Sequence, residues 1–417
     1  DPQDHDLIYA ESQGGSIHRF NLRTGEFKPL QPSPTEGQPA FRFNWNAPLI
    51  GSVHQKGVLY LGGNRVFRLT DHGEHFTLIS PDLSTHDPAK IMTTGSGAET
   101  YGVVFTLAES PVKPGLLWAG TDDGKLWKTE DEGAHWTDLT AHVPAPARGQ
   151  WISRVTPGAQ DPRVAYLAVD AYRTGLYAPL VYRTGDGGLT WQSLAANLPT
   201  DLPVKVVRED PVQPDLLFAG TEAGLYASLD RGASWVKFGG LPPVEVDDLQ
   251  IQPREHDLVI ATHGRSLYVL DDISPLEHLT PEAAAKPVDL FPVRPAHGAY
   301  PLPGWVDSAG EGEYRGANPP EGAILTYWIR DFTDESPTLA ITNAEGQPVA
   351  SFDLPRTPGL GRVVWNLRPS AKMLTPYGGL GARKFVPSGT YTATLSLGAV
   401  KAKQTIQVTI VPGIETR

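Results

Sequence analysis

The stretch Leu225-Tyr-Ala-Ser228-Leu-Asp230-Arg-Gly232-Ala-Ser-Trp235 decides the fold of this chain, because its pattern recurs. A Ser or Thr is followed two residues later by Asp, then by Gly and an aromatic residue. The pattern returns as Thr129/Asp131/Gly133/Trp136 and Thr184/Asp186/Gly188/Trp191, and more weakly as Leu69/Asp71/Gly73/Phe76. Successive Asp residues are 60, 55 and 44 positions apart, which indicates a structural repeat.

The residue types of this turn motif have a structural explanation. Each copy lies between two short apolar alternations, which is typical of a tight turn between strands. The carboxylate and the hydroxyl can accept backbone N–H groups, Gly supplies a positive φ, and the aromatic ring can pack between neighbouring sheets. We therefore interpret these residues as structural: Asp71, Asp131, Trp136, Asp186, Trp191, Asp230 and Trp235.

A second repeat sets the number of units. Proline-rich or polar turns recur at Asp1–Asp6, Ser52–Gly57, Ser110–Gly115, Gly158–Arg163, Asp210–Asp215 and Gln252–Asp257, each before an apolar strand and a small-residue hairpin. Four antiparallel strands per roughly 50 residues predict the blades of an all-β propeller of about six units. The first and last units are expected to be incomplete. Because a propeller should leave no raw sheet edge, we expect a missing N-terminal portion to complete a larger propeller.

The character of the sequence changes after the propeller. We assign residues 1–274 to the propeller, 275–320 to a Pro-rich connector and 321–417 to a β-sandwich. The connector is expected to be extended, with one or two helical turns at Pro281–Lys286. The last segment has no turn motif but several apolar alternations, which predict strands.

The turn motif resembles the Asp-box (BNR) repeat of sialidases, of xyloglucan-cleaving glycoside hydrolases and of the sortilin (VPS10) ectodomain. In those families the box is a folding element remote from the active site. The propeller segment looks most like the sortilin-like and glycosyl-hydrolase-like propellers of bacterial exported proteins. It departs from sortilin in lacking the following Cys-rich modules, and from the xyloglucan-cleaving enzymes in offering no identifiable pair of catalytic Asp residues.

A second resemblance concerns the C-terminal segment. The stretches Gly359–Arg368 and Pro387–Tyr391 resemble parts of the Ig-like domain of flagellar hook-capping proteins. This resemblance implies an Ig-like or fibronectin-like sandwich with no activity attached.

Composition excludes several classes of function. The formal net charge of −12 and the absence of a basic run argue against nucleic-acid binding. The chain has no Cys, which excludes thiol catalysis and Cys-type zinc sites. No apolar run approaches the roughly 20 residues of a membrane span. No metal-site spacing is present, so no cofactor is expected, although turn carboxylates could hold a structural calcium. The family resemblance implies a secreted, periplasmic or cell-surface protein.

Ligand-binding residues of propellers are expected on the hairpins and connections around the central channel. The acids of this face, from which a catalytic pair could come, are Asp122, Asp170, Glu222 and Asp247. The candidate ligand-binding residues are Glu11, Trp45, Asn64, Arg65, Asp123, Tyr172, Arg173, His263 and Arg265.

Three functions fit this arrangement. The first hypothesis is a non-catalytic or uncommitted binding propeller that recognises a peptide or a glycan. The alternative is a glycoside hydrolase that cleaves extracellular polysaccharide with two carboxylates from this face. A third is a purely structural subunit that holds partners through blade edges. Sialidase chemistry is not expected, because the Phe-Arg-Ile-Pro element of sialidases is absent.

Overall fold

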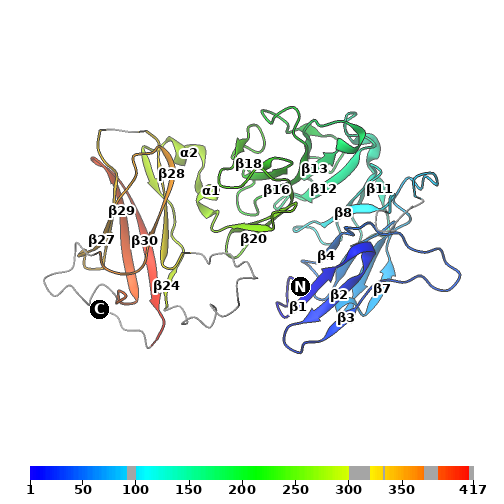
Figure 1. Ribbon diagram of the computed structural model, residues 1–417, viewed down its shortest axis with the longest axis horizontal. Coiled ribbons are helices and arrows are strands. Elements are labelled where there is room, and N and C mark those ends of the chain that lie inside the picture. The colour runs from blue at the N-terminus through cyan, green and yellow to red at the C-terminus, as the bar shows by residue number, and fades with distance from the viewer. Residues whose placement is uncertain (92–99, 300–319, 332–333, 371–383, 413–417) are drawn as a thin grey trace. The chain divides into compact units, whose positions relative to one another are not determined.

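A computed structural model describes residues 1–91, 100–299, 320–331, 334–370 and 384–412. The chain forms two compact units, Asp1–Leu270 and Asp271–Arg417, and each is described by itself. Figure 1 shows that nearly all regular structure is β-strand. Residues 300–319 of the expected connector lie outside the described residues.

The described part of the first unit contains six antiparallel sheets in chain order. The first has three strands: β1 (Leu7–Glu11), β2 (Ile17–Asn21) and β3 (Phe27–Pro29). Two four-stranded sheets follow: β4 (Leu49–Gly51), β5 (Leu59–Gly62), β6 (Val66–Thr70) and β7 (His75–Leu78), then β8 (Val104–Glu109), β9 (Leu117–Thr121), β10 (Leu126–Thr129) and β11 (Thr137–Asp138).

The remaining sheets of this unit repeat the pattern. The next two are β12 (Trp151–Pro157), β13 (Ala165–Asp170), β14 (Leu180–Thr184) and β15 (Gln192–Ser193), then β16 (Val204–Glu209), β17 (Leu217–Thr221), β18 (Gly224–Ser228) and β19 (Val236–Lys237). The last has only β20 (Val246–Gln252), β21 (Asp257–Thr262) and β22 (Leu267–Leu270). Short 3₁₀ turns η1 to η4 lie at Gln13–Gly15, Asp71–Gly73, Thr140–His142 and Tyr172–Thr174.

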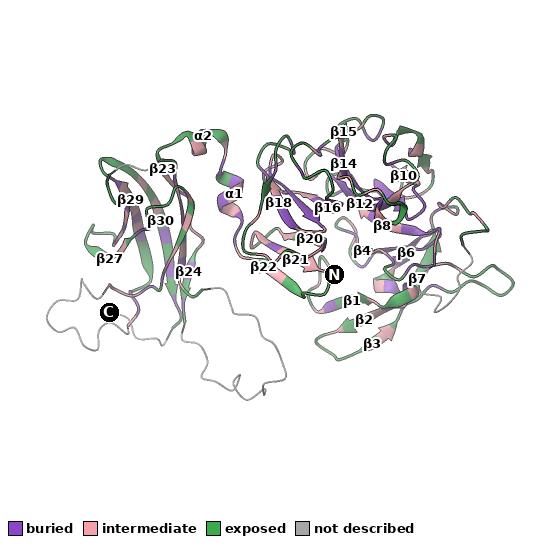
Figure 2. Ribbon diagram, turned by 45° about the horizontal axis from the view of Figure 1, so that its top comes forward, coloured by how far each residue is buried: buried purple, intermediate pink, exposed green. Residues whose placement is uncertain are grey.

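These sheets are propeller blades. The first strand of each sheet packs against the first strand of the next, in the order β4, β8, β12, β16 and β20. Consecutive sheets are therefore neighbours in space. Burial is high in β13 and β16 and low in the peripheral strands β7 and β22 (Figure 2). The prediction of about six propeller units, with the first and last incomplete, is confirmed.

The turn motif joins each blade to the one before it. In the copy at Asp131, Gly133 has a φ of 93°, and a Cβ there would lie 2.4 Å from the carbonyl oxygen of Ile79 in the preceding blade. The Trp136 indole donates to the same Ile79 carbonyl at 2.7 Å. Only Gly tolerates both the backbone angle and this approach, which explains its place in the motif.

The second unit is a two-layered β-sandwich. Helices α1 (Ser274–His278) and α2 (Pro281–Ala285) lead into it. One sheet has the order β23 (Val288–Leu290), β25 (Ala323–Ile329), β28 (Gly359–Trp365). The other has the order β24 (Ala296–Gly298), β30 (Val400–Ile410), β29 (Gly389–Leu397), β26 (Thr338–Thr342), β27 (Pro348–Asp353).

The core of the sandwich lies between its two sheets. Leu325 and Trp365 of one sheet and Leu339 and Leu395 of the other belong to a single buried cluster. Strands β23 and β24 lie in the segment that the sequence analysis assigned to a connector, where they pair with β25 and β30. Alternation is too short in these three-residue strands to be recognised from sequence.

Candidate functional site

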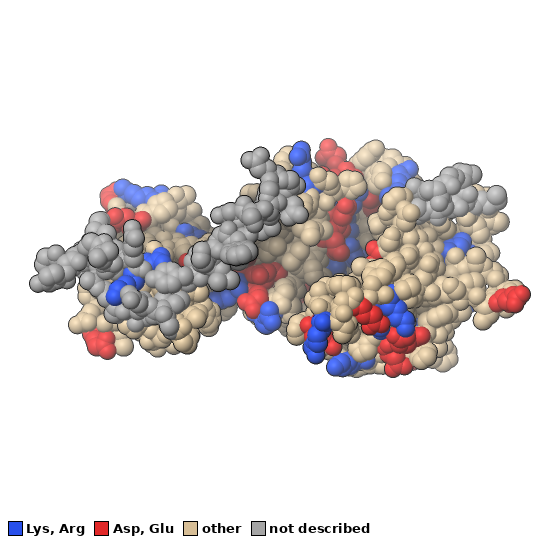
Figure 3. Space-filling model, turned by 60° about the horizontal axis from the view of Figure 1, so that its bottom comes forward, with Lys and Arg blue, Asp and Glu red and all other residues tan. Residues whose placement is uncertain are grey.

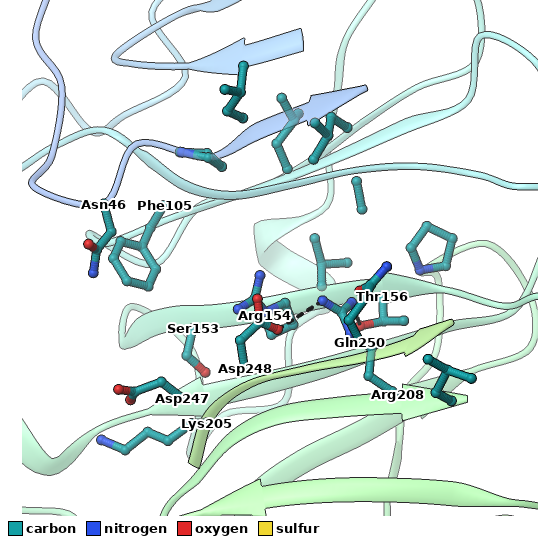
Figure 4. A pocket seen from close by; sticks show the side chains of 18 of the residues that line it. Asn46, Phe105, Ser153, Arg154, Thr156, Lys205, Arg208, Asp247, Asp248 and Gln250 are labelled. Atoms are coloured by element: carbon teal, nitrogen blue, oxygen red, sulfur yellow. Dashed lines mark hydrogen bonds and ion pairs between the residues drawn. The ribbon is translucent and has the colours of Figure 1, made fainter. Parts of the chain in front are cut away.

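The first strands of the blades line a channel through the first unit. Its volume is about 1600 Å³, and residues of β4, β8, β12, β16 and β20 form its wall. Figure 3 shows acidic and basic side chains gathered in a hollow of the molecule, and Figure 4 shows the labelled side chains of the channel from close by. These charged side chains form the candidate site.

A recurring β-bulge turns one extra residue of each strand into this channel. The pairing register shifts between Val104 and Thr106, Ile152 and Arg154, Val204 and Val206, and Val246 and Asp248. The extra residues are Phe105, Ser153, Lys205 and Asp247, and all four line the channel (Figure 4). Bulges commonly re-aim a side chain in this way. The four bulges therefore build one layer of the site.

Lys205 is the cation at the centre of an acidic cluster. Its ammonium lies 2.7 Å from a carboxylate oxygen of Asp170, 2.9 Å from Glu245 and 3.3 Å from Glu222. Burial opposes the charge of Lys205, but the hydrogen bonds that its ammonium donates to Asp170 and Glu245 outweigh burial and raise the Lys205 pKa. The ammonium therefore stays protonated and holds three carboxylates close together.

A second feature of the cluster is a close pair of acids. Glu245, Asp247 and His263 each offer an atom within 4.8 Å of those of the others, the one such group of metal-ligand side chains in the described ranges. Burial and the neighbouring Glu245 charge raise the pKa of Asp247, while the His263 hydrogen bond of 3.3 Å opposes the shift. A protonated acid beside an ionised one could cleave a glycosidic bond, and the same set could hold a divalent cation.

Aromatic rings form the wall beside these acids. The Phe105 and Trp151 rings meet edge to face with centroids 4.9 Å apart. The Arg173 guanidinium lies 3.9 Å from the Trp151 centroid and 4.4 Å from that of Tyr172. Arg173 therefore covers one face of Trp151, and the packed Phe105 and Trp151 rings form an apolar wall beside the acids.

A basic layer lies one step further along the strands. The Arg154 and Arg208 guanidinium groups lie 3.0 and 3.1 Å from the same Asp248 oxygen. Arg208 also donates to Thr156 Oγ1 at 3.0 Å and to the Leu249 carbonyl at 2.7 Å (Figure 4). The channel therefore carries an acidic layer and a basic layer in succession.

The structure brings together only part of the residues predicted from sequence. The candidates that line the channel are Asp170, Glu222, Asp247, Tyr172, Arg173 and His263. The candidates that do not line it are Asp122, Glu11, Trp45, Asn64, Arg65, Asp123 and Arg265.

The predicted acids outside the channel accept hydrogen bonds from backbone N–H groups. The Asp122 carboxylate accepts the N–H groups of Gly102 and Val103 at 3.0 and 2.9 Å, and burial raises its pKa to about 7. Asp123 accepts the Thr85 N–H at 2.7 Å, and Glu11 accepts the Gly15 N–H at 3.1 Å. Such contacts stabilise hairpins, so these acids have a structural role here.

The other predicted residues outside the channel either form hydrogen bonds within their own blade or are exposed to solvent. Asn64 donates to Asp82 at 3.0 Å, and Arg65 donates to the Ser80 carbonyl at 3.4 Å. Trp45 and Arg265 are exposed.

The basic residues of the channel were not predicted from the sequence. Lys205, Arg154 and Arg208 lie inside strands that alternate like any others, and only the bulge reveals which side chains turn inward. Glu245 lies in the connection before β20, next to the proline pair at 242–243, where an acid is unremarkable. No sequence signal marked them.

Comparison with known proteins gives distant relatives, and no family model matches the chain. A probable oligoxyloglucan-reducing end-specific xyloglucanase of Neosartorya fischeri is 25% identical over 247 residues, which are 58% of this chain and 28% of that protein. A xyloglucanase of a Paenibacillus species is 25% identical over 182 residues, 39% of this chain and 17% of that protein. The match thus spans less than a third of these relatives' length.

Solved structures show weaker similarity. The GH74 xyloglucanase from Xanthomonas campestris has a TM-score of 0.41 and 15% identity, covering 96% of this chain and 72% of that one. YCF48 from Cyanidioschyzon merolae has a TM-score of 0.45 and 10% identity, covering 64% and 79%. Because these TM-scores are low, the fold assignment rests on the sheets of the chain itself.

The relatives contradict the first functional hypothesis. Both curated relatives are named as xyloglucanases, which favours a glycoside hydrolase over a non-catalytic binding propeller. That hypothesis was wrong because hairpin acids are common for conformational reasons alone, so the sequence could not single out a working pair. Among the described residues no helix is long and apolar enough to cross a membrane.

Proposed function

We propose that this chain carries a glycoside hydrolase site at the acidic layer of the channel. The observation that supports it best is the close pair of Glu245 and Asp247, whose carboxylate oxygens lie within 4.8 Å of each other beside the Lys205 ammonium. Retaining glycosidases place their two carboxyl groups about 5–5.5 Å apart. The pair is therefore spaced for a retaining mechanism.

The environments of the two acids suggest their roles. Burial and the Glu245 charge raise the pKa of Asp247, which is the direction that a general acid requires, so we assign this role to Asp247. Glu245 forms an ion pair of 2.9 Å with Lys205 and is suited to act as the nucleophile. Two acids in unequal surroundings are a recognised basis for assigning acid and base roles.

The reaction would proceed in two displacements. Asp247 gives its proton to the glycosidic oxygen as the bond to the anomeric carbon breaks, and a Glu245 oxygen forms a new bond to that carbon. The sugar leaving group departs as a neutral alcohol. Asp247, now a carboxylate, then takes a proton from water, whose oxygen displaces Glu245 from the anomeric carbon and returns Asp247 to its protonated form.

The substrate is proposed to be a polysaccharide with a glucan backbone. The relatives named as xyloglucanases support this class, and the Trp151 and Phe105 rings supply an aromatic wall for a sugar ring. Such a polymer lies outside the cytoplasm, so we propose a secreted protein. We further propose that the sandwich of the second unit is Ig-like, and that further strands complete the open blade edges at β1 and β22.

The test is release of reducing ends from soluble xyloglucan and mixed-linkage glucan. Asp247→Asn and Glu245→Gln should each lower kcat/KM by at least about a thousandfold, because each removes a group that bonds to the reacting atoms. Asp201→Asn, an exposed acid outside the channel, is the matched control and should retain activity.

Two results would overturn the proposal. One is the absence of release by the unsubstituted protein on every glucan supplied. The other is release that survives in both variants. The assay is repeated in EDTA to distinguish acid catalysis from metal catalysis. Release of reducing ends by Glu245 and Asp247 alone should persist in EDTA.

A further inference from the structure

The blades of the first unit pack through an interface that recurs along the chain. Each inner sheet has a forward face, which packs against the next sheet, and a backward face, which packs against the preceding one. Val66 on the forward face of the second sheet belongs to one buried cluster with Leu117 on the backward face of the third. Leu126 of the third sheet and Ala165 of the fourth meet in the same way. A forward face and a backward face are therefore the two halves of one kind of contact.

The first sheet exposes its backward face. Tyr9 and Ile17 pack toward the second sheet, so the side chains that alternate with them in β1 and β2 lie on the opposite face. Among these are Ile8 and Phe20, which are cross-strand partners, and Phe27 of β3 pairs with Phe20 in turn. Ile8 is 44% exposed, Phe20 37% and Phe27 64%. Three large apolar side chains thus form one exposed row across the sheet.

The corresponding row of the second sheet is an interface. Strands β1 and β2 correspond to β5 and β6, in which Leu59 pairs with Leu69 as Ile8 pairs with Phe20. Leu59 is 1% exposed and Leu69 is 0% exposed, and both belong to the buried cluster that joins the first two sheets. The first sheet therefore carries a backward face of the ordinary composition that no blade of the described residues covers.

The last sheet exposes its forward face. Leu267 of β22 pairs with Ala261, as Leu126 pairs with Gly120 in the third sheet. Leu126 is buried against the next sheet, whereas Leu267 is 65% exposed. Val269 lies on the same face as Leu267, two residues further along the strand, and is also exposed. The last sheet therefore carries the other half of the recurring interface.

We propose that the backward face of the first sheet binds the forward face of the last sheet in a second copy of this chain. The partner is inferred from the contact that the chain already uses, because its blades pack forward face on backward face. Two copies can form this contact twice, which closes as a symmetric dimer. Exposed apolar patches of this kind mark interaction sites. The inference is independent of the hydrolase function, and it leaves the edges of β1 and β22 to the strands proposed above.

The first test is the mass of the purified chain, measured by light scattering over a range of concentrations. A dimer should replace the monomer as the concentration rises. Phe27→Asp and Leu267→Asp should each weaken the dimer at least about tenfold, because each places a charge in an apolar contact. Both positions are exposed, so both variants should fold, which thermal unfolding checks. The control is Val236→Asp, on the exposed outer strand β19 of the fifth sheet, which should leave the dimer unchanged.

The second test identifies the faces in contact. The chain has no Cys, so Phe27→Cys and Leu267→Cys each introduce a single thiol. A mixture of these two variants should form a disulfide-linked dimer on oxidation faster than either variant alone. A mixture of Val236→Cys and Leu267→Cys is the control and should show no such increase.

Three results would overturn the inference. They are a monomer at every concentration, a dimer that persists in both Asp variants, and a disulfide that forms within one copy when Phe27→Cys and Leu267→Cys are combined. The last result would mean that the two faces meet in a single molecule. Failure here is separate from failure of the hydrolase proposal, since none of the side chains of these two faces lines the channel.

Discussion

The Lys205 ammonium lies 2.7 Å from the Asp170 carboxylate, and the two side chains are 8% and 5% exposed. Lys205 enters the channel from a bulge of β16, whereas Asp170 is the last residue of β13. The ion pair therefore ties the first strand of one blade to the second strand of the blade before it. A pair so well removed from water makes each partner dependent on the other.

Replacement of Lys205 by Met should destabilise the first unit. The change leaves the buried Asp170 carboxylate without its ammonium, which typically costs about 3–5 kcal/mol. Urea unfolding followed by tryptophan fluorescence measures the loss. Lys237→Met, on the exposed edge strand β19, is the control and should stay within about 0.5 kcal/mol of the parent protein. A loss of less than about 1 kcal/mol for Lys205→Met would show that the pair is not important for stability.

Replacement of His263 by Ala should move the pH profile of hydrolysis. His263 lowers the pKa of Asp247, whereas burial and Glu245 raise it. Removing His263 therefore raises the Asp247 pKa further, and the proposed acid keeps its proton to higher pH. The basic limb of kcat/KM should therefore move to higher pH. His142→Ala, outside the channel, should leave the limb in place. A downward shift, or none, would contradict the role of Asp247.

Asp122 should make the stability of the first unit depend on pH. Its pKa is raised from 3.8 to about 7, so the folded state binds the proton more tightly than the unfolded state does. Stability should therefore fall as pH rises from about 4 to about 7, by on the order of 1–3 kcal/mol. Asp122→Asn removes this titration and should flatten the slope between about pH 4 and about pH 7 in thermal unfolding. Glu11, whose pKa is also raised to about 7, contributes a slope of the same sign.

The exposed Asp201→Asn should keep the parent slope. A slope unchanged in Asp122→Asn would show that this carboxyl group titrates normally.

The turn motif should matter for stability and not for catalysis. Asp230 accepts Ser228 Oγ at 2.7 Å and the Ser234 N–H at 2.8 Å, and it lies outside the channel. Asp230 also accepts Ser234 Oγ at 2.5 Å. Asp230→Ala should therefore cost about 1–2 kcal/mol of unfolding free energy, because it removes these three partly exposed hydrogen bonds. The kcat/KM of the folded fraction should equal that of the parent protein. Lost hydrolysis without lost stability would place the motif in the active site.

Much of the fold could be predicted because the signals are local. The hydroxyl of Ser228, the carboxylate of Asp230 and Gly232 act within one turn, with Gly232 N–H donating to Ser228 Oγ at 2.8 Å. A turn of this kind requires those residue types wherever it occurs, so it repeats visibly along the chain. Strands β23 and β24 were missed because three residues carry too little alternation to be recognised.

Much of the site could not be predicted because it depends on packing between blades. Asp122 and Asp247 look alike in the sequence, yet Asp122 bonds to the backbone at 102–103 and Asp247 faces the channel. Asp247 is the extra residue at the bulge of β20, whereas Asp122 lies in the hairpin between β9 and β10. A bulge inside a strand changes the side on which a side chain lies, and the sequence does not show where it occurs.

The sequence alone determined that this protein is a propeller of about six blades joined by repeated turns. The residues that such a turn requires are neighbours in the sequence, so the repeat can be recognised there. Tertiary structure alone decided which charges meet: it places Lys205 among Asp170, Glu222 and Glu245, and Arg154 beside Arg208. These side chains come from strands far apart in the chain. Whether they come into contact depends on how the blades pack and on where the bulges occur. Neither can be recognised in a short stretch of sequence.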